Sequence, residues 1–329
     1  MNIHWILAGV VIAFALTSVA GEKSLRRRLT DYRPTQIFAV GAGIILAPAN
    51  IRAALGGFSP TLESITIAVT CAAIVGIMLT YALHTIRKSQ APQPRRILAI
   101  GAHPDDLELA AGGTLARLAD SGHEINAIVM STGTNGGDPK VRINEAKEGA
   151  AFLGIRDCTV YDFEDTNLEG DMTGMIKAIE NKIRSFNPDI IFTHSANDQH
   201  QDHHAVHLAT LRAGRRHPAI LCFESPSATS EFSPQVFVDI DDYVEVKNSA
   251  IKIHDNQKKK PYMTAERVSG MAHFRGDQGK LGNAEGFEAV RFNAFKGLSN
   301  EGTSHRSGWP RRSCPIPAAY CQGRARHTS

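Results

Sequence analysis

The sequence predicts an α/β fold in which a doubly wound, mostly parallel sheet is preceded by N-terminal transmembrane helices. Strand-like and helix-like runs alternate from residue 97 to residue 254, which is typical of βαβ units with helices on both faces of a parallel sheet. Long apolar runs fill the first 88 residues, and a helix needs roughly 20 apolar residues to cross a membrane. We therefore expect a Rossmann-like domain attached to a membrane anchor.

The division of the chain follows its composition. We expect a membrane anchor at 1–88, a Pro-containing linker at 89–96, the α/β domain at 97–295, and a disordered basic tail at 296–329, because the tail is rich in Gly, Ser, Pro and Arg without apolar periodicity. Within the domain, the expected strands are Ile97–Ile100, Ile125–Ser131, Thr159–Phe163, Ile190–Thr193, Ala219–Phe223 and Val236–Ile240. The expected helices are Leu107–Asp120, Arg142–Leu153, Met172–Phe186, His203–Ala213 and a last one near Tyr243–His254.

Three apolar runs lie in the anchor. Trp5–Ala20 and Ile65–Ile86 contain no formal charge, whereas Gln36–Leu55 is interrupted by Pro48, Asn50 and Arg52. We expect three transmembrane helices, or two if residues 36–55 do not span. A cleaved signal peptide is the alternative for the first run, but Met1–His4 lacks the basic residues with which signal peptides begin.

Basic residues flank the apolar runs unevenly. They follow the first run (Lys23, Arg26, Arg27, Arg28, Arg33) and the third (Arg87, Lys88, Arg95, Arg96), whereas the loop at 56–64 has none. Because Lys and Arg favour the cytoplasmic side of a membrane, we expect a multi-pass membrane protein whose soluble domain faces the cytoplasm.

Two polar stretches each follow a predicted strand. Ala102-His103-Pro104-Asp105-Asp106-Leu107-Glu108 comes after the first strand, and Asn197–His207, which contains His200-Gln201-Asp202-His203, comes after the fourth. Asp at a helix start can simply cap the helix. However, ligands bind at the carboxyl ends of strands in open α/β sheets, so two strand ends that both carry His and Asp can converge on one metal.

Together these two stretches resemble the motifs of the zinc-dependent N-acetylglucosaminyl deacetylases of the PIG-L/LmbE-like family, and the similarity extends over about residues 96–293. The resemblance implies a Zn²⁺ site, although another divalent metal remains possible. The implied ligands are His103, Asp106 and His203. The implied catalytic residues are Asp105 as general base, His200 as the group that stabilises the developing oxyanion, and Asp202 as the carboxylate that orients an imidazole.

The same resemblance points to a substrate side. Arg142 and Glu145 match the family's substrate-binding pair, with a surface ion pair as the alternative. Lys247, Ala250, His254 and Gln257 resemble its closing helix, and Ala284–Arg291 its final strand. Outside the resemblance, the Gly-rich loop Thr132–Asp138 either contacts substrate or is a plain loop, and Lys258–Lys260 is expected to be a solvated loop.

Charge and cysteine usage exclude other classes of protein. Residues 97–295 contain 20 Lys and Arg against 29 Asp and Glu, so the domain lacks the basic footprint of a nucleic-acid enzyme, and we expect no nucleic-acid partner. The five cysteines form no C-x-x-C pair, which argues against a thiolate zinc site.

The expected function is metal-dependent hydrolysis of an N-acetyl group from an amino sugar or its glycoconjugate, which could be lipid-linked. A deacylase of a non-sugar amide and a sugar-binding scaffold without turnover remain the alternatives.

Overall fold

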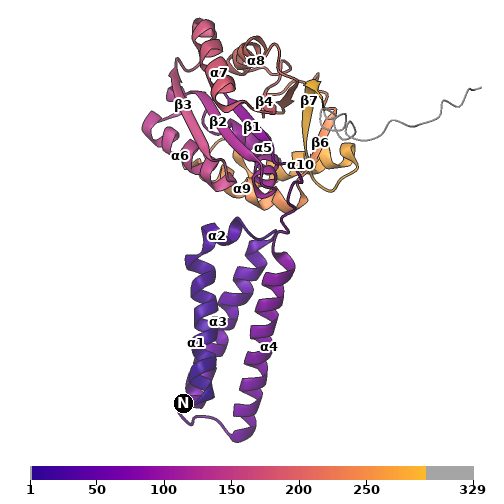
Figure 1. The fold of residues 1–329 in the computed structure, drawn as a ribbon. Coiled ribbons are helices and arrows are strands. Elements are labelled where there is room, and N and C mark those ends of the chain that lie inside the picture. Colours follow the sequence, from indigo (N-terminus) through magenta and orange to yellow (C-terminus); the bar gives the residue numbers. More distant parts are fainter. Residues whose placement is uncertain (1, 294–329) are drawn as a thin grey trace, which may run out of the picture. The chain divides into compact units, whose positions relative to one another are not determined.

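The computed structural model describes residues 2–293, in which three long helices precede an α/β domain (Figure 1). The domain contains one seven-stranded sheet with the order β3-β2-β1-β4-β5-β7-β6. The strands are β1 (Arg96–Gly101), β2 (Glu124–Ser131), β3 (Asp157–Phe163), β4 (Ile190–His194), β5 (Ala219–Phe223), β6 (Val236–Asp239) and β7 (Ala284–Phe292). Strands β1 to β5 pair in parallel, whereas β7 is antiparallel to β5 and β6. The predicted doubly wound, mostly parallel sheet is confirmed.

Helices cover both faces of this sheet. The helices are α5 (Asp106–Asp120), α6 (Pro139–Leu153), α7 (Met172–Phe186), α8 (Gln201–Ala213), α9 (Val244–Ile251) and α10 (Ala265–Gly279). Apolar residues of α7 and α8 pack in one core, and those of α5, α6, α9 and α10 in the other. The first polar stretch, residues 102–108 (the first box), thus leads into a helix on one face. The second, residues 197–207 (the second box), leads into a helix on the opposite face.

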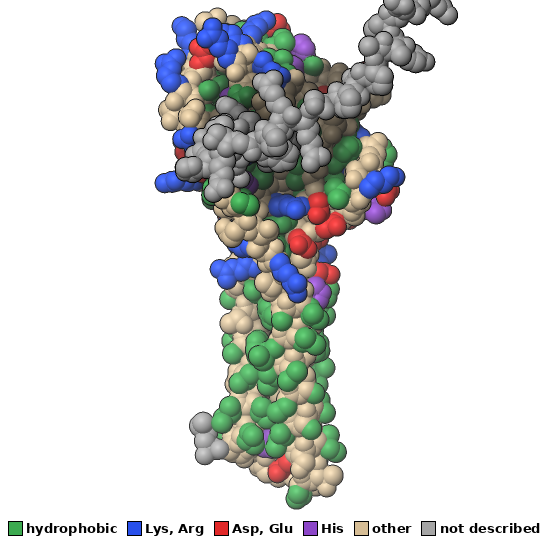
Figure 2. All heavy atoms as spheres, turned by 45° about the vertical axis from the view of Figure 1, so that its right-hand side comes forward, with side chains coloured by type: hydrophobic (Ala, Val, Ile, Leu, Met, Phe, Trp, Pro, Cys, Tyr) green, Lys and Arg blue, Asp and Glu red, His purple; other side chains and the backbone are tan. Residues whose placement is uncertain are grey.

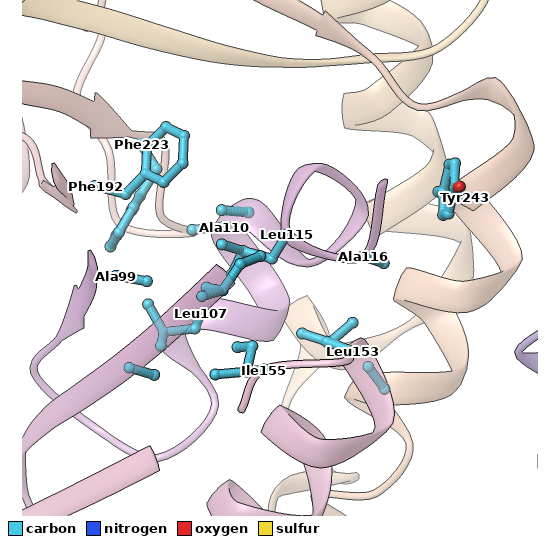
Figure 3. Packing of buried hydrophobic residues seen from close by; sticks show 14 of the residues in the cluster. Ala99, Leu107, Ala110, Leu115, Ala116, Leu153, Ile155, Phe192, Phe223 and Tyr243 are labelled. Atoms are coloured by element: carbon cyan, nitrogen blue, oxygen red, sulfur yellow. The ribbon is translucent and has the colours of Figure 1, made fainter. Parts of the chain in front are cut away.

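Strand β1 shows how the sequence builds two cores at once. Side chains alternate between the faces of a strand, so Ile97 and Ala99 join the core under α5, α6 and α9, while Leu98 and Ile100 join the core under α7 and α8. All four are fully buried. A strand buried on both faces is a continuous apolar run, as expected in a parallel sheet. Figure 3 shows the core under α5, α6 and α9, where Ala99 lies among larger neighbours that include Leu107 and Phe223.

One expectation about the helices was wrong. The helix expected near Tyr243–His254 is shorter, ending at Ile251, and it is not the last, because α10 follows it. Helix α10 contains Gly270, Gly276 and Gly279, which weaken a helical pattern. The fold nevertheless requires a glycine here, because a Cβ at Gly276 would lie 2.3 Å from the carbonyl oxygen of Gly282. Tertiary packing against β6 and β7 therefore stabilises a helix that local propensity does not predict.

The three long helices are α1 (Ile3–Ala20), α3 (Tyr32–Ala54) and α4 (Pro60–His84), and the short α2 (Glu22–Arg26) follows α1. Each long helix is long and apolar enough to cross a membrane, including α3, whose sequence is interrupted by Pro48. Figure 2 shows hydrophobic side chains over the surface of these helices and Lys and Arg side chains gathered at one end. The predicted tail at 296–329 lies outside the described residues.

A buried polar chain links the three helices. The imidazole Nδ1 of His4 lies 2.9 Å from Oδ1 of Asn50, whose amide nitrogen donates to the hydroxyl of Thr70 at 2.8 Å and to the carbonyl of Leu46. His4, Asn50 and Thr70 are each at most 3% exposed. The chain thus ties α1, α3 and α4 together by side-chain hydrogen bonds.

Candidate active site

Both polar boxes lie where the strand order of the sheet reverses. Strand β1 lies between β2 and β4, and the helices that follow β1 and β4 pack on opposite faces. The chain therefore leaves the two strands in opposite directions, and a crevice opens at their carboxyl ends. The first box follows β1 and the second follows β4, so the topology alone brings together residues about 100 positions apart.

The backbone of the first box holds Asp106 in one orientation. Its Oδ2 accepts hydrogen bonds from the backbone N–H groups of Ala102 (2.9 Å) and His103 (2.7 Å). This leaves Oδ1 facing Nε2 of His203 at 3.4 Å. Burial disfavours the carboxylate, but His203 and His194 beside it hold the pKa of Asp106 well below its usual range. Asp106 thus presents one anionic oxygen to the second box.

Asp105, immediately before, has a strained backbone. Its φ of 113° is a left-handed conformation that a residue with a Cβ rarely adopts. The side chain is 5% exposed and lines the cavity described below. Burial, with a contribution from the Asp106 charge, raises the pKa of Asp105 to about 6, which is a suitable value for exchanging protons near neutral pH.

In the second box, a carboxylate holds the far nitrogen of His203. Nδ1 of His203 lies 2.9 Å from Oδ2 of Asp198, which also accepts from the hydroxyl of Ser225, while Oδ1 accepts from that of Ser227. Asp198 therefore holds the proton of Nδ1, so Nε2, the nitrogen facing Asp106, is the one that would give up its proton to bind a cation. Burial opposes the charged form of His203, but Asp106 and Asp198 outweigh it and raise its pKa to about 9.

His103 is held in the same way by carboxylates from elsewhere in the chain. Its Nε2 lies 3.0 Å from Oδ2 of Asp202 and 3.3 Å from Oδ1 of Asp165. Asp202 is itself anchored by the backbone N–H groups of Thr166 and Leu168. Nδ1 of His103 then faces Asp106 Oδ2 at 3.6 Å. The imidazole that Asp202 contacts is therefore that of His103, and its orienting role stays a prediction.

His200 is the N-cap of α8. Its Nδ1 accepts from the backbone N–H of Asp202 at 3.2 Å, so the proton of a neutral imidazole resides on Nε2. Burial, together with the charges of His203 and His103, lowers the pKa of His200. A neutral His200 at the cavity wall is a hydrogen-bond donor through Nε2. Its ring packs 4.5 Å from that of His203.

The donor set fits a divalent cation. Among residues 2–293, three trios of side chains have ligand atoms within 4.8 Å of one another: His103, His200 and His203; Asp106, His194 and His203; His103, Asp165 and Asp202. The predicted ligands His103, Asp106 and His203 are distributed among these trios and contact one another as described. Imidazole nitrogens and one carboxylate suit zinc and related metals.

A cavity of about 300 Å³ contains most of the predicted site residues. Its lining includes His103, Asp105, Asp106, Asn135, Gly136, Arg142, Asp165, Thr166, His200, His203, Ser227 and Lys260. Asn135 and Gly136 come from the Gly-rich loop, which therefore borders the site. The expectation that Lys258–Lys260 is a solvated loop was wrong for Lys260, which is half-buried and lines the cavity.

Of the two predicted substrate-binding residues, Arg142 lines the cavity and Glu145 does not. Arg142 is 3% exposed and donates to the carbonyl oxygens of Gly133 (2.7 Å) and Pro104 (2.8 Å), with Asp105 at 3.5 Å. It thereby joins the Gly-rich loop to the first box. Glu145 is also buried, but it accepts from the backbone N–H of Asn256 and is not part of the cavity lining. The two do not form the surface ion pair considered as the alternative.

Sequence reasoning assigned no role to three residues that contact the predicted ligands. Asp198 orients His203, Asp165 contacts His103, and His194 stacks on His203 with ring centroids 3.9 Å apart. His194 is fully buried, and burial with the His203 charge lowers its pKa to about 4, so it is neutral. Asp198 and His194 lie within or next to the second box, whose position after a strand was a usable signal. Asp165 also comes directly after a strand, β3, but no His accompanies it there, so the His and Asp pattern of the two boxes was missing.

Comparison with known proteins agrees with this geometry. A family model described as GlcNAc-PI de-N-acetylase (PIG-L) matches residues 98–214, which include both boxes. The chain is 41% identical over 173 residues to the uncharacterized deacetylase YaiS of Escherichia coli K12, covering 50% of this chain and 94% of that protein. It is 30% identical over 188 residues to the diacetylchitobiose deacetylase of Thermococcus kodakarensis, covering 50% of this chain and 70% of that one.

Solved structures show the same fold. The N,N′-diacetylchitobiose deacetylase of Pyrococcus horikoshii superposes with a TM-score of 0.53 at 22% identity, covering 62% of this chain and 88% of its own. The 4-carboxy-2-hydroxymuconate hydratase GalB of Pseudomonas putida also gives a TM-score of 0.53, at 21% identity, covering 60% of this chain and 97% of its own. Because the fold is shared with a hydratase, the reaction has to be argued from the site residues.

Proposed function

Since this chain belongs to the PIG-L family of deacetylases, we propose that it hydrolyses the N-acetyl group of an amino sugar or its glycoconjugate, releasing acetate and a free amine. The observation that supports this most directly is the pair of complete boxes facing each other across one cavity, with Asp106 Oδ1 3.4 Å from His203 Nε2. A diacetylchitobiose deacetylase and a probable N-acetyl-alpha-D-glucosaminyl L-malate deacetylase are among the relatives.

We assign metal binding to His103, Asp106 and His203. When bound at such a site, zinc lowers the pKa of a water molecule toward ~7 and polarises the amide carbonyl. The carboxylates of Asp202 and Asp198 hold the far nitrogens of His103 and His203, so both imidazoles keep the tautomer that binds a cation. This mixed imidazole and carboxylate set suits zinc, the metal that we propose.

Asp105 acts as the general base. Its carboxylate lies at the cavity wall beside the metal-binding residues, where it accepts a proton from the attacking water and returns that proton to the leaving amine. The guanidinium of Arg142 at 3.5 Å stabilises the ionised form of Asp105 between turnovers. The strained backbone of Asp105 persists because the helix start and the buried contacts around it determine its conformation.

His200 stabilises the oxyanion that forms as water attacks the amide carbon. The backbone N–H of Asp202 occupies its Nδ1, so Nε2–H is the atom that donates to the developing negative charge. Arg142, with the Gly-rich loop that it holds, contacts the sugar at the cavity wall. Glu145 supports this side indirectly by holding the backbone of Asn256.

We further propose that the protein is a multi-pass membrane protein whose catalytic domain faces the cytoplasm. The support is the length and apolarity of α1, α3 and α4, together with the basic residues that surround the end of α1, the start of α3 and the end of α4. A protein held at a bilayer encounters amphiphilic glycoconjugates, so a lipid-linked amino sugar is a suitable substrate class.

The test is acetate release by the full-length protein in lipid nanodiscs, assayed with and without added Zn²⁺ after treatment with a chelator. The panel contains methyl N-acetylglucosaminide, N,N′-diacetylchitobiose and N-acetyl-lysine. We expect acetate from the sugars, dependent on about one equivalent of metal. Acetate from N-acetyl-lysine alone would favour the non-sugar deacylase, and sugar binding without acetate would favour the scaffold.

A further inference from the structure

A second cavity adjoins the candidate active site. Its volume is about 160 Å³, and it lies between α5, α9, α10 and the start of β7. Leu109, Pro226 and Tyr262 line both this cavity and the cavity that contains the two boxes. A substrate whose sugar occupies the first cavity can therefore extend into the second through the wall that they share.

The wall of the second cavity is mainly apolar. Ala110, Val268 and Ala272 are buried in its wall, and Met271 stands at its rim with 47% of its surface exposed. Such walls stabilise apolar groups by removing them from water. They contribute few hydrogen bonds to a second sugar ring.

The charged residues of this wall neutralise one another. Nζ of Lys247 lies 2.5 Å from Glu285 Oε1. The guanidinium of Arg275 binds both oxygens of Glu224, at 2.8 and 2.6 Å. Arg267, the remaining charged residue of the lining, is exposed to solvent. The enclosed part of the cavity therefore offers neither an unpaired cation nor an unpaired anion.

We propose that this second cavity binds an apolar group of about six carbons attached to the amino sugar, so that the substrate is an amphiphilic glycoside. The size follows from the volume, because an apolar cavity of about 150 Å³ accommodates a benzene-sized group. The inference rests on the deacetylase function proposed above. It agrees with the presence of three helices able to span a membrane, since amphiphilic substrates concentrate at bilayers.

The experiment compares kcat/KM for acetate release from methyl and hexyl N-acetylglucosaminides and from N,N′-diacetylchitobiose. The full-length, metal-loaded protein is used in lipid nanodiscs, so that no detergent chain competes for the cavity. Because each fully buried methylene is worth about fourfold and ordering the chain offsets part of this gain, we expect the hexyl glycoside to exceed the methyl one by about 10- to 100-fold. Longer chains should add little.

Two test variants and one control variant locate the effect. Met271→Asp places a charge at the rim of the cavity and should reduce the hexyl-to-methyl ratio at least fivefold. Phe274→Asp is the matched control, because Phe274 is on the same helix and 51% exposed but is not part of the cavity wall, and it should leave the ratio unchanged. Ala272→Leu, which fills the cavity from its buried wall, should lower the ratio without adding charge. Circular dichroism confirms that each variant is folded.

The outcomes separate the two proposals. No acetate from any of the glycosides would overturn the deacetylase function itself. Acetate from all of them with a hexyl-to-methyl ratio near one, or a preference for diacetylchitobiose over the hexyl glycoside, would leave the deacetylase standing and overturn the apolar subsite. A ratio that survives both Met271→Asp and Ala272→Leu would also overturn it.

Discussion

The α/β domain and the three-helix segment both bury polar side chains, but they do so for different ends. In the helices, His4, Asn50 and Thr70 bond to one another and to the backbone, and among the described residues α1, α3 and α4 leave no buried side-chain polar atom without a partner. In the domain, the buried His and Asp residues line an open cavity, and Asp105 has a strained backbone. The network in the helices is closed and holds elements together, whereas the one in the domain opens onto a cavity and can accept a ligand.

If the open network of the domain binds a metal, substitution of His203 should have the largest effect on activity. Asp198 contacts Nδ1 of His203 and so orients Nε2 toward Asp106. Because His203→Ala removes this imidazole, metal content and acetate release should both fall to background. Metal analysis and an acetate assay on the same sample provide the measurement. His204→Ala is the control, because His204 is the exposed neighbour on α8, and it should retain both. Full turnover by His203→Ala would show that the open network is not a metal site.

Asp105→Asn should separate binding from chemistry. The amide keeps the size of the side chain but removes the general base, so turnover should fall by about 10² to 10⁴-fold while metal content stays near one equivalent. Asp255→Asn, at an exposed ion pair with Lys258, serves as the control with unchanged activity. Loss of metal together with activity would instead assign Asp105 to metal binding.

Asp198→Asn tests whether the carboxylate behind His203 is part of the site. Asp198 contacts His203 but does not line the cavity, so it acts by orienting the imidazole. Removing such an orienting carboxylate typically costs about 10- to 100-fold in metal affinity or activity. A titration of the metal-free protein with Zn²⁺ measures the affinity, and excess metal should partly restore turnover. An unchanged affinity would limit the role of Asp198 to holding Ser225 and Ser227.

The smallest effect is expected in the helices. Thr70→Val removes the oxygen that accepts from Asn50 and should lower the stability of the helix bundle by about 1 kcal/mol with no loss of turnover. Denaturant unfolding in detergent, followed by helical circular dichroism, measures this. Thr17→Val is matched to it, because the Thr17 hydroxyl bonds only within its own helix at an exposed position, and it should change stability less. Equal effects of the two variants would contradict a linking role for the polar chain.

By itself, the sequence determined the elements and the two boxes. Periodicity is a local property, so the parallel strands, the helices between them and the apolar runs of α1, α3 and α4 could be identified from neighbouring residues. The boxes could be placed at one edge of the sheet because βαβ connections have a regular geometry. Helix α10 was not predicted, because its glycines obscure the helical periodicity of its apolar residues and because its packing against β6 and β7 is not a local property.

The tertiary structure alone decided which groups complete the site. Asp165 reaches His103 from the loop after β3, Arg142 turns its guanidinium to the carbonyl of Pro104, and Lys260 returns to the cavity from a loop that looks solvated in sequence. These contacts join segments separated by 38 to more than 150 positions, and their existence depends on where whole helices and loops pack. The neighbouring side chains then determine the chemistry. Burial raises the pKa of both carboxyl groups, to about 6 at Asp105, but the imidazoles of His203 and His194 hold the pKa of Asp106 well below its usual range.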